Sequence, residues 1–459
     1  MIKKILYTIF IALLPLVAFG AEHNLADCEY TTIDNFINHA TPAGFIRGDT
    51  VVCPADTATW STTLPLTTGI IFKGAGAGST VITTTADPAI EISPDATMRS
   101  SDERLEIDGM TFNGSGYWVT IENENTDEIS NFIVGNCSIN GYGRTFNVTG
   151  NVYGLVYSNT INPNGWLAQF LGYEQDSWQN HTTTYGTTDQ FWFEDNTITG
   201  NSYVNSGHGS RYAMRYNTFI SQGEIQHFDF HGNVNSTCSH MIGEVYGNIY
   251  TNISSFEFVY QRGGQLLVYN NRFSGTSSLW IDISELTDDS ASACFGLGTQ
   301  HVNNSYYWNI HDDGGELNTT PGTDYTISDC CDAIDEDVDY FLTNPAGCTT
   351  SNCQSGIGQG SAVPTGNCLV GTAYWVTSYS PASTPPTTMA DMKTYTQAGR
   401  LWKCTSTNVW ELFYTPLDYP HPLRGEETPV PANAIQGMQI SNLNVTNNLI
   451  AWHRTDGLR

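Results

Sequence analysis

The stretch 193–198 reads FEDNTI and the stretch 214–219 reads MRYNTF, so one six-residue pattern recurs after 21 residues. In both copies an apolar residue precedes an Asn by three positions, and a second apolar residue follows that Asn by two. Extending the comparison in both directions finds eight such units along the chain. Their anchors are Met110, Cys137, Asn159, Asn196, Asn217, Asn248, Asn271 and Asn304, separated by 27, 22, 37, 21, 31, 23 and 33 residues.

The residues that flank each anchor are apolar in nearly every unit. Three positions before it stand Ile107, Val134, Val156, Phe193, Met214, Val245 and Val268; two positions after it stand Phe112, Ile139, Ile161, Ile198, Phe219, Tyr250, Phe273 and Tyr306. A strand, a sharp turn at the anchor and a second strand would place both sets inside, since Asn tolerates left-handed backbone. Stacking such units at about 4.7–4.9 Å predicts a parallel solenoid with a continuous core and a ladder of inner Asn side chains.

These units resemble the coils of the secreted, right-handed parallel β-helix proteins of the pectate-lyase-like superfamily. The segments 48–54 (GDTVVCP) and 69–76 (GIIFKGAG) are similar to that family's first coils, and the Asn-Thr-Phe/Ile steps to its ladder. The resemblance covers roughly residues 30–310. It implies an all-β fold, a single-stranded right-handed parallel β-helix, but not one function, because members include polysaccharide lyases, polygalacturonases, tailspikes and adhesins. A β-propeller or sandwich is the alternative fold.

Composition and charge exclude several kinds of partner. The chain has 459 residues with 17 Lys+Arg against 46 Asp+Glu, a net charge of −29, which argues against nucleic-acid binding.

Lys3 and Lys4 precede an apolar run from Ile5 to Phe19, which indicates a secretory signal peptide of bacterial type and a secreted, extracellular or periplasmic protein. No later stretch has the roughly 18 apolar residues of a membrane span.

Eleven cysteines in an exported chain predict disulfides rather than a zinc site, and the odd count leaves at least one thiol over. Cys137, on the inner ladder, is the expected free thiol. Six of the cysteines fall between Cys330 and Cys404, which predicts a disulfide-rich C-terminal module. We expect a signal peptide over 1–20, an N-terminal cap over 21–60, the β-helix over 61–311, a Cys- and Trp-rich module over 312–424, and a linker with a last coil over 425–459.

Candidate catalytic residues come from strand alternation in three successive coils. In 226–232 (QHFDFHG), Phe228 and Phe230 should point inward, so that His227, Asp229 and His231 point outward. Aligning the inward residues of the next two coils stacks three acids in one outward column, namely Asp229, Glu257 and Asp282. Carboxylates about 5 Å apart repel, so they must raise a pKa, bind a cation or be neutralised by a base.

Two kinds of chemistry fit this column. Two carboxylates could act as the acid and base of a glycosidase. Alternatively, the three acids hold Ca²⁺ against a uronate while His227 or His231 removes the C5 proton, with Arg262 as a further catalytic candidate. The competing interpretation is that these groups are solvated surface. Gly207-His208-Gly209 is similar to a polygalacturonase motif, but the acidic pair of that family is missing, so no residue role is carried over.

Aromatic residues are the candidates for substrate binding. Tyr246 and Tyr269 should stack on an outward face, Trp166 and Trp178 belong to an expanded unit that overhangs the helix, and Trp280 lies on the third acidic strand. These residues suggest a polysaccharide-acting or polysaccharide-binding protein, either a lyase or a glycosidase on acidic glycans. The alternative is a non-catalytic surface adhesin or a structural fibre subunit, in which self-association replaces catalysis.

Overall fold

The computed structural model describes residues 20–39, 45–181, 184–200, 202–220, 228–232, 237–252, 255–275, 278–285, 300–312, 315–316, 325–329, 334–379 and 384–424. The expected signal peptide, His227 and the expected linker and last coil therefore lie outside the described residues. Within them, no helix is long and apolar enough to cross a membrane.

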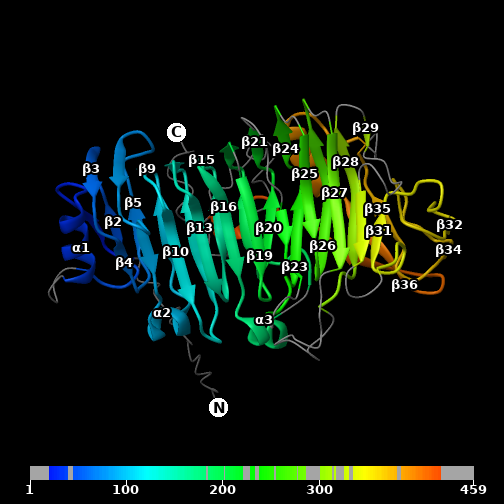
Figure 1. Ribbon diagram of the computed structural model, residues 1–459, viewed down its shortest axis with the longest axis horizontal. Coiled ribbons are helices and arrows are strands. Elements are labelled where there is room, and N and C mark those ends of the chain that lie inside the picture. The colour runs from blue at the N-terminus through cyan, green and yellow to red at the C-terminus, as the bar shows by residue number, and fades with distance from the viewer. Residues whose placement is uncertain are drawn as a thin grey trace, which may run out of the picture. The chain divides into compact units, whose positions relative to one another are not determined.

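Three stacks of parallel strands form the body of the protein, and successive strands follow one another along it in chain order (Figure 1). The first stack contains β1 (Glu22–Asn24), β2 (Thr50–Val52), β5 (Ile71–Lys73), β8 (Leu105–Asp108), β11 (Ile129–Gly135), β14 (Val152–Tyr157), β17 (Phe191–Glu194), β20 (Arg211–Arg215), β23 (Ile242–Tyr246), β26 (Gln265–Phe273), β28 (Ser305–Asp312) and β31 (Tyr340–Leu342).

The second stack continues each coil after a sharp turn, and β26 belongs to both stacks. It contains β3 (Asp56–Trp60), β6 (Thr80–Thr84), β9 (Thr111–Asn113), β12 (Ser138–Asn140), β15 (Thr160–Asn162), β18 (Thr197–Thr199), β21 (Thr218–Ile220) and β24 (Ile249–Thr251). The third stack closes the coil with β4 (Leu64–Leu66), β7 (Ile90–Ile92), β10 (Tyr117–Asn123), β13 (Arg144–Gly150), β16 (Gly165–Leu171), β19 (Ser202–Gly207), β22 (Phe228–Phe230), β25 (Ser255–Gln261), β27 (Ser278–Glu285) and β30 (Tyr325–Asp329).

This arrangement confirms the parallel β-helix and the inward-facing positions of the first seven units. The eighth unit is wrong, because Asn271 pairs with Ile310 rather than with Asn304, and Tyr306 pairs with Leu267. In the first stack the expected inward residues pair in register from coil to coil, from Val134 through Val156, Phe193 and Met214 to Val245, and all are fully buried. Helix α1 (Tyr30–Asn38) buries Ile33 and Ile37 in the same core. Two short helices, α2 (Ala96–Ser101) and α3 (Glu174–Asn180), lie between strands. The parallel stacks begin at β1 and end at β31, so they extend beyond 61–311 at both ends.

The Asn ladder is present and runs through five consecutive coils. Each amide Nδ2 donates to Oδ1 of the next Asn, at 3.0 Å from Asn159 to Asn196, 2.9 Å from Asn196 to Asn217, 3.1 Å from Asn217 to Asn248 and 3.1 Å from Asn248 to Asn271. The left-handed residue of each turn is the one before the ladder Asn, for example Tyr216 with φ 57°. The expectation that the anchor itself adopts left-handed backbone is therefore wrong, because its side chain satisfies the backbone groups inside the turn.

We expect Asn217→Ala to lower the free energy of unfolding by about 1–3 kcal/mol, because it leaves buried polar groups without partners. The Asn217 side chain donates to Phe193 O at 3.0 Å and accepts from Asn196 N at 3.0 Å, and the residue is fully buried. Denaturant unfolding measures the change. Asn162→Ala is the matched control, since Asn162 is exposed on β15. Equal stability of the two variants would contradict a structural role for the ladder.

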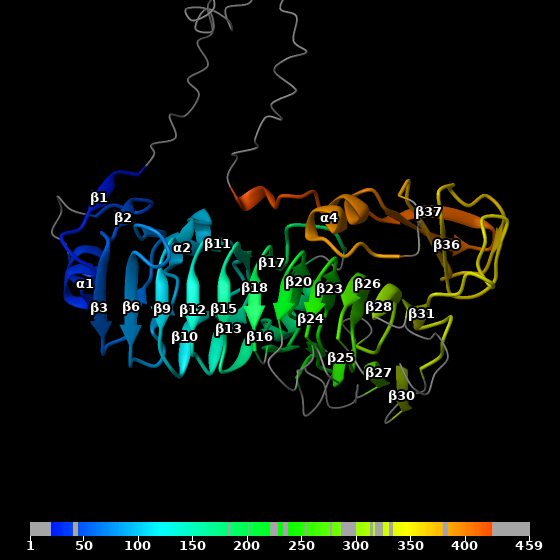
Figure 2. The same cartoon turned by 90° about the horizontal axis from the view of Figure 1, so that it is seen from above.

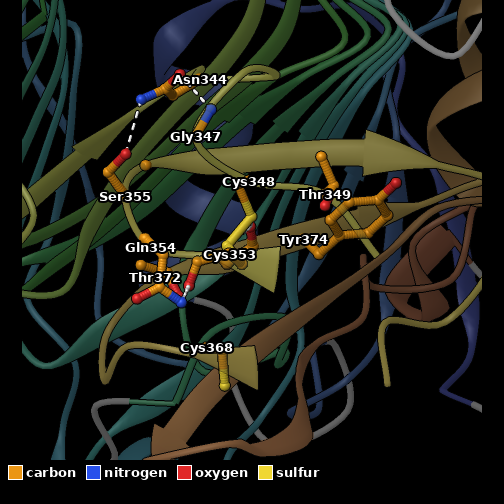
Figure 3. Close-up of a disulfide and its surroundings, with 12 residues drawn as sticks. Asn344, Gly347, Cys348, Thr349, Cys353, Gln354, Ser355, Cys368, Thr372 and Tyr374 are labelled. Atoms are coloured by element: carbon orange, nitrogen blue, oxygen red, sulfur yellow. Dashed lines mark hydrogen bonds between the residues drawn. A yellow bond between two sulfur atoms is a disulfide. The ribbon is translucent and has the colours of Figure 1, made fainter. Parts of the chain in front are cut away.

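A C-terminal module follows the last coil and is held by two disulfides. It contains β33 (Ile357–Gly360), β35 (Ala373–Val376), β36 (Arg400–Ser406), β37 (Val409–Tyr414), the short pair β32 (Asn352–Cys353) and β34 (Asn367–Cys368), helix α4 (Met389–Gln397) and the 3-10 turn η2 (Pro422–Arg424). Cys348 is bonded to Cys353 beside Tyr374 (Figure 3), and Cys368 is bonded to Cys404. The predicted disulfide-rich module is thus confirmed.

The remaining described cysteines divide into one bonded and three free thiols. Cys238 is disulfide-bonded, whereas Cys28, Cys53 and Cys137 are free and buried. The prediction for Cys137 is confirmed, and burial raises the pKa of its thiol to about 12, which makes it unreactive at neutral pH. Cys294, Cys330 and Cys331 lie outside the described residues.

The C-terminal module lies along the first stack, beside β17, β20 and β23 (Figure 2). Arg215 on β20 donates to Asp418 O at 2.9 Å, and Tyr414 donates to Glu244 on β23 at 2.6 Å. The module therefore covers the outward face of the first stack from β17 to β28 and leaves that of the third stack as the candidate surface for chemistry.

Candidate functional site

A row of polar side chains crosses the outward face of the third stack. The register pairs Gln169 with Asn205, Asn205 with Asp229, Asp229 with Tyr260, and Tyr260 with Asp282. Phe228 and Phe230 are buried on either side of Asp229, as alternation predicts.

The expected column of Asp229, Glu257 and Asp282 is wrong in its middle member. A register irregularity between Glu257 and Val259 places Tyr260 level with Asp229, and Glu257 pairs with Trp280 instead. The extra residue in β25 could not be read from the apolar alternation, because the apolar run from Phe258 to Tyr260 offers an inward residue in either alignment.

Asp229 is the most heavily bonded acid on this face. Arg262 donates to its carboxylate from Nε at 3.1 Å and from Nη2 at 2.7 Å to each oxygen. Tyr203 donates its hydroxyl to Oδ2 at 2.6 Å, and Asn205 its amide at 3.2 Å. Burial opposes ionisation of Asp229, but the hydrogen bonds and charges of His231 and Arg262 outweigh it and hold its pKa well below the usual range. Asp229 is therefore an anion at neutral pH.

One ring nitrogen of His231 contacts both Asp229 and Arg262. Its Nε2 lies 3.1 Å from Asp229 Oδ2 and 2.5 Å from Arg262 Nη2. A guanidinium can only donate, so Nε2 either accepts from Arg262 or carries a proton and donates to Asp229. Within the described residues, His231 Nδ1 and Arg262 Nη1 have no hydrogen-bond partner. Each is thus available to a ligand.

A cleft of about 500 Å³ opens beside this cluster. Its walls include Trp166, Tyr203, Asn205, His208 and His231. His208 comes from the motif that the sequence comparison set aside, and Glu174 of α3 lies 2.5 Å from its Nδ1. The cleft thus joins the cluster to the overhanging unit, and Trp166 lies where a substrate-binding ring was predicted.

Two further acids lie on the neighbouring coils. Burial, with the negative charges of Asp282 and Asp229, raises the pKa of Glu257 to about 7. Burial also raises the pKa of Asp282, and Ser284 donates to its Oδ1 at 3.2 Å. Glu257 is therefore partly protonated at neutral pH, a state in which a carboxyl group can donate a proton.

The predicted Ca²⁺ ligands do not converge in the part of the chain that the structure describes. No group of three or more His, Cys, Asp or Glu residues there has the geometry to hold a metal ion. Both carboxylate oxygens of Asp229 accept hydrogen bonds from Arg262 Nη2.

Four of the five predicted sugar-binding aromatics do not line the cleft, and only Trp166 does. Tyr246 and Tyr269 stack at 4.7 Å, as predicted, but both are fully buried. Tyr269 contacts Tyr414 of the C-terminal module at 2.8 Å between hydroxyls, so that module covers the strip. Trp178 is buried in the same apolar cluster. Trp280 is half-buried on the third stack, level with Glu257.

Sequence reasoning missed Tyr203 and Asn205. Both lie on β19, one coil before Asp229, and alternate with Val204, which is fully buried. Extending the outward column by one coil toward the N-terminus would have included Asn205, and strand alternation would then have included Tyr203.

No protein-family model matches the sequence, and no curated protein matches it. Among solved structures, the chain is similar to a mannuronic acid specific polysaccharide family 6 lyase from human gut microbiota, at 12% identity over 76% of this chain and 82% of that one, with a TM-score of 0.42. It is also similar to a PL6 family alginate lyase, at 11% identity over 87% of this chain and 59% of that one, with a TM-score of 0.34. Identities this low carry no residue roles from either enzyme to this chain.

Proposed function

We propose that this protein cleaves an acidic polysaccharide by β-elimination at the Asp229 cluster. The observation that supports it is the Asp229 carboxylate bound at once to Arg262 and His231, at the edge of a cleft of about 500 Å³. Asp229 orients Arg262 and His231 toward one cleft. Arg262 can bind a substrate carboxylate there, and His231 can remove a proton next to that carboxylate.

The elimination needs three events at one uronate. Arg262 donates from Nη1 to the uronate carboxylate, which makes the C5 proton more acidic. His231 then removes that proton, the C4–O bond breaks, and the electron pair of the C5–H bond forms a C4=C5 double bond. The departing glycosidic oxygen receives a proton from Glu257 or from water, so the products are a new reducing end and an unsaturated sugar.

His231 suits the base role because of its two partners. When Arg262 binds a substrate carboxylate, Nε2 of His231 no longer needs to accept from Arg262. It can then carry a proton and donate to Asp229, which lies 3.1 Å away. Nδ1 then carries the lone pair that accepts the C5 proton, and the anionic Asp229 stabilises the imidazolium that forms.

Hydrolysis is the second candidate, and the raised pKa of Glu257 favours it. A carboxyl group with a pKa of about 7 beside a second acid is the pattern of a glycosidase general acid. In this scheme Glu257 protonates the leaving oxygen and Asp282 activates water.

The products decide between these candidates. We expect purified protein, incubated with polyuronates of different linkage and with a neutral glycan, to give new reducing ends together with the ultraviolet absorbance of an unsaturated uronate. Reducing ends without absorbance would replace elimination by hydrolysis. Binding without turnover would favour the adhesin alternative, and neither binding nor turnover would refute polysaccharide action altogether.

Ca²⁺ binding by Asp229, Glu257 and Asp282 stays a prediction, and no step above uses it. Calorimetric titration of the protein with CaCl₂ tests it, with Glu257→Gln as the comparison. Binding that Glu257→Gln weakens would support a calcium site there, and no heat in either protein would dismiss it.

Glu257→Gln should also change how stability depends on pH. The pKa of Glu257 is raised from 4.5 to about 7 in the folded protein, so the folded state holds a proton that the unfolded chain releases earlier. Wild type must therefore lose stability as pH rises from about 4.5 through about 7, and Gln, which cannot ionise, removes that loss. We expect the variant to have the higher melting temperature at pH 8 but not at pH 4. Glu122→Gln, at an exposed position of β10, is the control. Identical pH profiles for wild type and Glu257→Gln would contradict the raised pKa.

A further inference from the structure

A second outward row crosses the third stack, two or three residues before the row of Asp229. The register pairs Tyr117 with Arg144, Arg144 with Trp166, and Trp166 with Tyr203. None of these four side chains is fully buried, and Tyr117 is 37% exposed. The row begins four coils before Asp229 and ends one coil before it, where Tyr203 donates to the Asp229 carboxylate.

Arg144 is held rigidly in this row but has no acidic partner. Its guanidinium carbon lies 4.8 Å from the ring centre of Tyr117 and 4.3 Å from that of Trp166. Nη1 donates to the amide oxygens of Asn147 at 2.8 Å and Gln169 at 2.5 Å. Within the described residues, Nη2 has no hydrogen-bond partner and no carboxylate forms an ion pair with Arg144.

In this respect Arg144 differs from Arg215 and Arg262, which both pair with carboxylates. Acids outnumber Lys and Arg by 46 to 17 in the chain. Burial lowers the pKa of Arg144, which shows that its charge is held at a cost in free energy. An anionic ligand that only accepts hydrogen bonds would offset this free-energy cost. A carboxylate fits well, because its two oxygens match the planar guanidinium.

The two rows are joined by direct hydrogen bonds. Gln169, which accepts from Arg144, donates to Asn205 at 3.3 Å, and Asn205 donates to Asp229 at 3.2 Å. The rings of Trp166 and Tyr203 meet edge to face at 4.8 Å, and both line the cleft beside His231. A ligand in the cleft therefore contacts a continuous surface that ends at an arginine on either side.

We propose that Arg144, clamped between Tyr117 and Trp166, binds the carboxylate of a uronate residue remote from the one that reacts at Arg262. β13 and β25 are four rungs apart, about 19 Å at a rung spacing of about 4.8 Å, so the groove spans several sugars of one polymer strand lying parallel to the helix axis. Trp166 and Tyr203 supply faces for the sugars between. This assignment rests on the proposed function and adds its substrate class, an extended polyuronate.

The test compares Arg144→Gln with wild type on uronate oligosaccharides of increasing length. We expect KM to rise by about tenfold or more for oligomers long enough to span both arginines, with kcat kept, and no change for the shortest oligomers. Calorimetry of the same oligomers gives the loss of affinity without requiring turnover. Arg144→Lys keeps the charge but not the planar fork, so it should recover only part of the affinity.

Arg104→Gln is the matched control, because Arg104 pairs with Glu106 at the start of β8, on the first stack. A carboxyl-reduced polymer should bind wild type and Arg144→Gln equally. If KM of Arg144→Gln depends on oligomer length as it does in wild type, and cleavage is normal, the site at Arg144 is refuted. The proposed function is not affected by that result. Tight binding of a sulfated neutral polymer at Arg144 would overturn the carboxylate assignment. Absence of any binding or cleavage by wild type removes the proposed function itself.

Discussion

Replacement of Arg215 by Met is expected to lower the free energy of unfolding by about 3–5 kcal/mol, because it leaves a buried carboxylate without its partner. Arg215 and Glu194 are both fully buried, and Arg215 Nε donates to Glu194 Oε2 at 2.7 Å. The guanidinium also donates to Leu417 O and Asp418 O of the C-terminal module, which lose these bonds in the variant.

Denaturant unfolding measures this loss, and the double variant Glu194→Gln, Arg215→Met separates its causes. Replacing the unpaired Glu194 carboxylate by an amide should restore part of the stability, because the double variant no longer buries an anion without a partner. Arg47→Met is the control, since its pair with Asp95 is exposed on both sides and exposed pairs contribute about 1 kcal/mol or less. Wild-type stability in Arg215→Met would mean that water or another cation reaches Glu194.

Asp229→Asn is expected to lower kcat/KM by on the order of 10²–10⁴ with little change in size at the site. The amide cannot hold Arg262 through two oxygens or orient a protonated His231, so both groups lose their alignment. His231→Gln should cost about as much, and the double variant little more, since the residues act as one unit.

The control for this loss is a similar pair remote from the cleft. His23 Nε2 lies 2.8 Å from Asp49 Oδ2 beside the first coils, so His23→Gln removes an equivalent contact without touching the third stack. Melting temperatures of all variants exclude unfolding as the cause. Cleavage by Asp229→Asn at the wild-type rate would place the chemistry elsewhere.

The sequence predicts the fold well because each coil repeats a local rule. Val156, Phe193 and Met214 occupy equivalent places in successive coils, so their common burial follows from the repeat alone. The Asn ladder follows from the same register. The left-handed position was misplaced by one residue because two polar residues, such as Asp195 and Asn196, compete for one turn.

The site is predicted only where it depends on a single strand and the residues just after it. Asp229 and His231 alternate on one short segment, and their outward direction could be deduced. Glu257 was assigned to the wrong position along its strand because a register irregularity adds a residue that apolar alternation does not reveal. Tyr246 and Tyr269 were expected at the surface because nothing in their own strands indicates that residues near Tyr414, some 145 positions later, cover them.

The contacts of the C-terminal module also affect how the protein unfolds and how it folds during synthesis. A stack in which each coil touches only its neighbours frays from its ends. Here the module is bonded to β17 through His421, to β20 through Asp418, to β23 and β26 through Tyr414, and to β28 through Gly371. These five coils cannot loosen one at a time without releasing the module, so they should melt in one cooperative transition. Because the module follows these coils in the chain, they gain this protection only after the module has been synthesised.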